Sequence, residues 1–65
     1  MDLNRADYIS MHPGKHTAEE RRAAAAKARR ALNEPGAHAA TKRRAELIQG
    51  KLANFEASLP QESKR

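Results

Sequence analysis

The chain has 65 residues, and its hydrophobic side chains are mostly small: 14 are alanine, which leaves eleven larger ones to form a core. Typical ligand pockets of about 300–1,000 Å³ need more large side chains than this, and no catalytic or cofactor motif is present, so we expect no enzyme, no cofactor and no small-molecule substrate. The formal net charge of +5 favours anionic partners, and the lack of cysteine excludes disulfides and cysteine-based zinc sites.

The first residues, 1–5, have neither the basic nor the apolar region of a secretory signal. No apolar run approaches the roughly 18 residues that cross a bilayer as a helix, so we expect no membrane partner. The sequence therefore predicts a cytoplasmic protein.

Two Pro-Gly pairs divide the chain, at residues 13–14 and 35–36, and Pro60 follows the last helical stretch. Between these breaks, residues of high helix propensity dominate, and the whole chain holds only four β-branched residues. The sequence therefore predicts an all-α protein in three parts. These are an N-terminal segment over 1–16, an antiparallel helical hairpin over 17–59 and a disordered tail over 60–65.

The N-terminal segment has the pattern of a two-turn helix over residues 4–11. Asn4 is the expected N-cap, with Asp7 as a capping acid three residues later. A helix this short is marginal alone, so the alternative is a flexible arm. The helix would need an apolar surface on which to rest its four larger apolar side chains, Leu3, Tyr8, Ile9 and Met11.

The first helix of the hairpin is predicted over residues 18–32. Thr17 and Glu20 have the spacing of a capping box, which starts a helix at Ala18. We expect Asn33 to end it in a left-handed conformation. The apolar face consists largely of alanine, and such small side chains allow a second helix to approach closely.

The second helix is predicted over residues 37–59, and it carries the sharpest pattern in the sequence. Its apolar stripe has the alternating spacing of 4, 3, 4, 3 and 4 that is typical of a coiled-coil seam: Thr41, Ala45, Ile48, Leu52, Phe55 and Leu59. Gly50, within this helix, indicates either a close helix crossing or a weak point.

The short link over residues 34–36 predicts that the two helices are antiparallel neighbours. The second helix is longer by about eight residues, so we expect Leu52, Phe55 and Leu59 to protrude beyond the first. Either a second copy of the chain covers the stripe, or the N-terminal segment folds back over it with Tyr8, Ile9 and Met11. Because one chain offers so small a core, we favour a homodimer whose seam consists of Ile48, Leu52, Phe55 and Leu59.

The three histidines do not predict a metal site. His12 and His16 are four residues apart, but the Pro-Gly pair between them makes a turn, so they do not share a helix face. We expect both to be solvated. His38, near the start of the second helix, is expected to be a half-exposed structural residue.

Clustered basic residues are the other candidate binding feature. On the second helix, Arg43, Arg44 and Lys51 follow one flank of the stripe together with Leu47, and Arg29 and Arg30 add charge on the first helix. We expect this basic ridge to contact nucleic-acid phosphates or an acidic protein surface. The alternative is a charged face that only keeps the protein soluble.

Three functions fit these patterns. The one that we favour is a small non-enzymatic regulator, adaptor or inhibitor that binds another protein through an apolar-plus-basic helical surface. Its apolar anchors would be Leu3, Tyr8, Ile9, Met11 and Leu47. The second is a basic accessory protein that contacts the phosphate backbone of nucleic acid. The third is a coiled-coil assembly piece that folds only within a larger complex.

Overall fold

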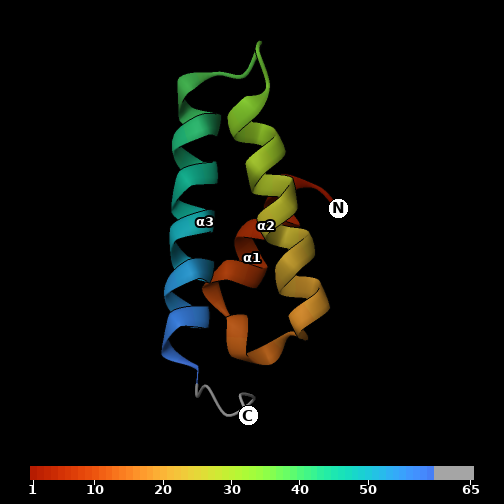
Figure 1. Cartoon of the computed structure of the whole chain (residues 1–65). Helices are drawn as coiled ribbons and strands as arrows, with labels where there is room; N and C mark the ends of the chain where they lie inside the picture. The colour runs from red at the N-terminus through yellow and green to blue at the C-terminus, as the bar shows by residue number, and fades with distance from the viewer. Residues whose placement is uncertain (60–65) are drawn as a thin grey trace.

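Three α-helices and one 3₁₀ turn make up residues 1–59, the part of the chain that the structure, a computed structural model, describes (Figure 1). The helices are α1 (Leu3–Met11), α2 (Ala18–Asn33) and α3 (Ala39–Ser58), and the turn η1 (Pro13–Lys15) joins α1 to α2. No strand occurs within these residues, so the predicted all-α class is confirmed for them. The expected disordered tail, residues 60–65, lies outside the described residues.

The N-terminal segment forms a helix, but its cap differs from the prediction. The side chain of Asp2 accepts a hydrogen bond of 2.9 Å from the backbone N–H of Arg5, so Asp2 is the N-cap. Asn4 lies within the first turn, and the expectation that it caps the helix is wrong because an equally good capping residue precedes it. At the other end, Pro13 disfavours helical geometry at His12, and α1 stops at Met11.

Helix α2 begins at the predicted capping box. The Thr17 hydroxyl accepts from the Glu20 N–H at 3.1 Å, and the Glu20 carboxylate accepts from the Thr17 N–H at 2.9 Å. The predicted left-handed Asn33 is wrong, since no residue within 1–59 has a positive φ angle. The chain leaves the helix through an extended Glu34, the geometry that the following Pro35 favours.

Helix α3 starts two residues later than predicted, at Ala39, with His38 as its N-cap. The N–H of Ala37 donates to the Glu34 carbonyl in a turn, which keeps Ala37 in the connection. Helices α2 and α3 lie side by side and run in opposite directions, and α1 lies against both (Figure 1). Among the described residues, a Cβ atom added at Gly50 would meet no neighbour within 4 Å, so this glycine marks no close crossing of α3 with another described helix.

The core lies where the three helices meet, and alanine supplies more than half of it. Its buried residues are Ala6, Ile9, Ala24, Ala28, Ala45, Ile48 and Leu52. Alanine at these positions allows the helices to approach closely, and Ile9 and Ile48 are the largest fully buried side chains.

The expectation that Leu52 protrudes is wrong, because Leu52 is part of this core and only 3% exposed. The N-terminal segment folds back and covers the stripe with Ala6 and Ile9, as in the alternative to a dimer. Phe55 and Leu59 are half-buried rather than protruding. Within residues 1–59, the single chain thus already covers most of the stripe on which the dimer prediction was based.

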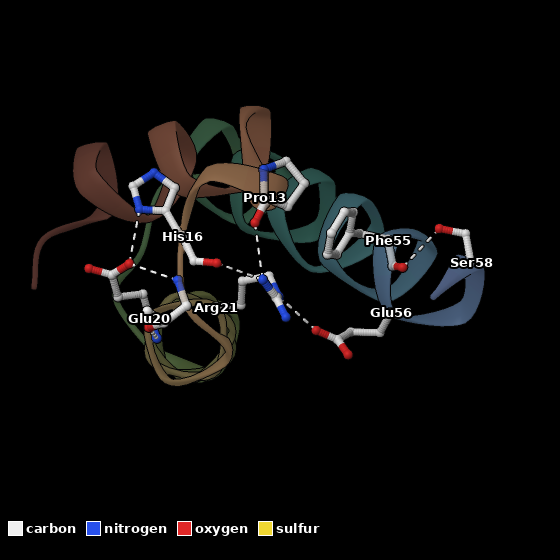
Figure 2. A network of polar contacts seen from close by, with 8 residues as sticks. Pro13, His16, Glu20, Arg21, Phe55, Glu56 and Ser58 are labelled. Atoms are coloured by element: carbon white, nitrogen blue, oxygen red, sulfur yellow. Dashed lines mark hydrogen bonds and ion pairs between the residues drawn. The ribbon is translucent and has the colours of Figure 1, made fainter. Parts of the chain in front are cut away.

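Arg21 ties the end of the molecule that contains η1 to both long helices (Figure 2). Its guanidinium donates to the carbonyl oxygens of Pro13, at 3.1 Å, and His16, at 2.7 Å, while its Nε donates to Glu56 on α3 at 2.9 Å. The same group lies over the Phe55 ring, 4.8 Å from the ring centroid. One side chain therefore holds the turn, α2 and α3 together.

Candidate functional site

Large apolar side chains are exposed on neighbouring turns of α1 and α3. Tyr8, Met11 and Leu47 are 52%, 58% and 57% exposed. Lys51 links the two helices here, because its Nζ lies 3.2 Å from the Met11 sulfur and it follows Leu47 by about one helical turn. Tyr8 precedes Met11 by three residues and therefore neighbours it on the surface of α1. We call the surface formed by Tyr8, Met11, Leu47 and Lys51 the α1–α3 face.

Polar contacts between α1 and α3 fix the position of this face. The Arg44 guanidinium donates to the Asp7 carboxylate at 3.0 and 3.1 Å and to the Asn4 side-chain oxygen at 2.7 Å. Asp7 is therefore an ion-pair partner of α3 rather than a capping acid. Because Arg44 precedes Leu47 by three residues and Lys51 follows it by four, Leu47 lies between two contacts that hold α1 in place.

The other side of Tyr8 faces two histidines. Its ring centroid lies 4.9 Å from that of His12 and 5.7 Å from that of His16, and His16 Nδ1 lies 3.2 Å from a Glu20 carboxylate oxygen. The Thr17 N–H that donates to Glu20 lowers the pKa of this carboxyl from its ordinary value of 4.5; burial opposes the shift, and His16 adds to it. No group of three or more His, Asp or Glu within residues 1–59 is placed to hold a metal ion.

The structure separates the predicted apolar anchors. Tyr8, Met11 and Leu47 share the α1–α3 face, whereas Ile9 is fully buried and Leu3 is half-buried against the core. The predicted seam residues Ile48 and Leu52 are also in the core. Phe55 packs under Arg21, and Leu59 is half-buried at the end of the described chain.

The predicted basic ridge is not a single surface. Arg43 is exposed, and its side chain has no ion pair or hydrogen bond within residues 1–59, while Arg44 is paired with Asp7. Arg29 lies at a groove between α2 and α3, and Arg30 lines a separate hollow beside Leu3. The cations therefore face different parts of the molecule.

The groove between α2 and α3 was missed by the sequence analysis. It measures about 530 Å³, and no α1 residue lines it. The α2 side contributes Ala18, Arg21, Arg22, Ala25 and Arg29, and the α3 side contributes Gln49, Leu52, Ala53 and Glu56. The seven-residue spacing of Arg22 and Arg29 was the available signal, but only the pairing of the two helices shows what lies opposite. We call this feature the α2–α3 groove.

No protein-family model, curated protein or solved structure matches the chain. None of the helices within residues 1–59 is long and apolar enough to span a membrane.

Proposed function

We propose that this chain is a small non-enzymatic regulator or adaptor that binds another protein through the α1–α3 face. The supporting observation is the distribution of large apolar residues. Within residues 1–59, only three of them, Ile9, Ile48 and Leu52, are in the buried core, while Tyr8, Met11 and Leu47 are each more than half exposed. A chain so poor in large apolar side chains gains little stability from leaving three of them in water. Their position together is typical of a protein interface.

The chemistry of the face also fits a protein partner. Tyrosine and methionine are enriched at protein interfaces. Tyrosine provides a large contact area with little loss of side-chain entropy, and the flexible methionine side chain adapts its shape to the partner. Lys51 at the edge, and exposed Arg43 nearby on α3, would attract acidic residues at the rim. Nucleic acid is less well supported, since Arg44 of the predicted basic ridge is already paired with Asp7, and Arg29 and Arg30 line separate hollows.

Photo-crosslinking in cells that make the protein tests this proposal. A benzoylphenylalanine residue would replace Leu47 in one variant and Ala26, which is exposed on α2, in the control variant. We expect a protein adduct of defined mass from position 47 and none from position 26. The adduct should disappear when Met11→Asp is added, because this exposed position tolerates the change while the face loses an apolar anchor.

Other outcomes would contradict the proposal. A nuclease-sensitive adduct at position 47 would indicate a nucleic-acid partner, and an adduct of twice the chain mass would indicate self-association. The proposal requires a partner protein that binds the α1–α3 face specifically. Equal labelling at positions 26 and 47, or no adduct at either position, would show that the face has no such partner.

A further inference from the structure

The α2–α3 groove has an apolar floor of small side chains. Ala18 and Ala25 on α2 and Leu52 and Ala53 on α3 line it. Leu52 is almost fully buried, whereas Ala53 is exposed and Ala25 is half-buried. Because alanine projects so little, the backbone of an incoming helix could approach α2 and α3 closely, as the helices of the core do. The floor therefore suits an apolar helix stripe.

The two walls of the groove differ in charge. Arg22 and Arg29 stand on the α2 wall, and neither side chain has a hydrogen bond or ion pair within residues 1–59. They are seven residues, and thus about 10.5 Å, apart along the same side of α2. The α3 wall instead presents Gln49 and Glu56, and Glu56 is paired with Arg21 (Figure 2). Positive charge is available on one wall only.

This asymmetry selects among possible occupants. A nucleic-acid strand fits the groove poorly, because only Arg22 and Arg29 are free to pair with its row of phosphates, and the opposite wall carries Glu56 and no cation. A second copy of this chain also fits poorly, because no two of its acidic residues are seven positions apart to match Arg22 and Arg29. An amphipathic helix with two acids seven residues apart on one flank fits both the apolar floor and the cationic wall.

We propose that the α2–α3 groove binds an acidic amphipathic helix of another protein. Its apolar stripe lies on Ala18, Ala25 and Ala53, and two carboxylates seven residues apart pair with Arg22 and Arg29. The groove shares no residue with the α1–α3 face, so this inference does not depend on the function proposed above. A chain that uses both surfaces holds two partners at once.

The probe that tests the groove is a fluorescent synthetic peptide of about 18 residues, long enough for some five helical turns. Leucines form one stripe, and glutamates seven residues apart form its flank; a second peptide carries glutamine in place of glutamate. Anisotropy titrations with the full chain should show that the glutamate peptide binds at least about tenfold more tightly than the glutamine peptide.

Charge-reversal variants locate the binding. We expect Arg22→Glu combined with Arg29→Glu to weaken binding of the acidic peptide by at least about tenfold. Lys15→Glu combined with Arg43→Glu makes the same change in net charge at exposed positions outside the groove and should have less than about a twofold effect. Circular dichroism would verify that both variants keep the helix content of the parent chain.

Further variants make the outcome decisive. Ala53→Asp puts a charge on the exposed floor and should also weaken binding, whereas Leu47→Asp, on the α1–α3 face, should not. Equal loss from the two double variants would show non-specific charge attraction and would overturn the proposal. A glutamine peptide that binds as tightly as the glutamate peptide, or a labelled DNA duplex that competes fully for Arg22 and Arg29, would overturn it too.

Discussion

At the scale of single residues, Arg21 has a structural role that its place in an Arg-Arg pair does not reveal. Its side chain is 12% exposed and contacts η1, His16 directly after η1, and Glu56 near the end of α3, whereas its neighbour Arg22 is exposed. Charge-assisted hydrogen bonds of this kind contribute more than neutral ones. Their loss takes the side-chain donor from the His16 carbonyl, whereas the Pro13 carbonyl still accepts from the His16 N–H. The two adjacent arginines should therefore respond differently to the same substitution.

We expect Arg21→Ala to lower the free energy of unfolding by about 2 kcal/mol, while Arg22→Ala changes it by less than about 0.5 kcal/mol. Urea denaturation followed by circular dichroism measures both. Effects of similar size in the two variants would mean that the contacts in Figure 2 contribute little to stability.

Because of Glu20, the stability of the fold should depend on pH in the acid range. Because the Thr17 N–H, together with His16, lowers the pKa of Glu20 below 4.5, the folded state favours the charged carboxylate more than the unfolded state does. This contribution is present above pH 4.5 and is lost as the pH falls through the lowered pKa of the folded state.

The comparison between the wild type and Glu20→Gln measures this effect. Glutamine keeps the capping-box hydrogen bond but does not titrate, so the wild-type advantage in Tm should shrink as the pH falls from about 5 to about 3. The exposed neighbour Glu19→Gln is the control and should show a weaker trend, since Glu19 has no such hydrogen bond within residues 1–59. A constant difference between wild type and Glu20→Gln would contradict the capping role of the charged form.

At the scale of elements, α1 completes the core. Ile9 is fully buried against α2 and α3, and Leu47, a residue of similar size, is 57% exposed. Ile9→Ala should cost about 2–5 kcal/mol, which is most of the stability that a chain of this size has, whereas Leu47→Ala should change stability by less than about 0.5 kcal/mol. Thermal melts of both variants test this. If Ile9→Ala melted like the wild type, α1 would not be part of the core in solution.

Local signals in the sequence predicted the helices well. The capping box at Thr17 and Glu20 and the proline breaks depend only on neighbouring residues, so they placed the start of α2 correctly and the other helix ends to within one or two residues. The cap of α1 was missed because Asp2 and Asn4 are both good capping residues. Local pattern does not decide between two such neighbours.

Packing between helices was harder to predict. The spacing of apolar residues along α3 correctly identified an apolar stripe. Such spacing does not reveal which surface covers the stripe. Leu52 was therefore predicted to lie in a dimer seam, whereas it lies in the core of the single chain. The exposed anchors Tyr8, Met11 and Leu47 were named from the sequence. The α2–α3 groove was not, because its floor is alanine and its wall forms only when the register of α2 on α3 is known.

At the scale of the whole molecule, the distribution of charge limits how nucleic acid can bind. The bundle is narrow, with extents of 43 × 19 × 14 Å, and its exposed cations without partners within residues 1–59 face different sides. We expect a duplex lying along one side of such a molecule to contact two or three of these cations. Because each neutralised phosphate contributes about −0.9 to the slope of log affinity against log salt, we expect a slope no steeper than about −2 to −3.

Fluorescence anisotropy of a labelled DNA duplex, at salt concentrations from about 50 to about 200 mM, measures this slope. Arg43→Ala should reduce the slope by no more than about 1. A slope near −4 to −5 would show that the cations act as one surface, and it would favour nucleic acid over a protein as the partner.

The proposed surfaces depend on one property of the whole molecule, which is that a single chain closes its own core with α1. The dependence of Tm on protein concentration tests this property most directly. From about 5 to about 500 µM, the Tm should stay constant, because folding of a monomer does not depend on concentration. If the folded state were a dimer, a hundredfold increase in protein concentration would stabilise it by roughly 2.7 kcal/mol and raise the Tm by several degrees. Such a rise would show that a second copy completes the core.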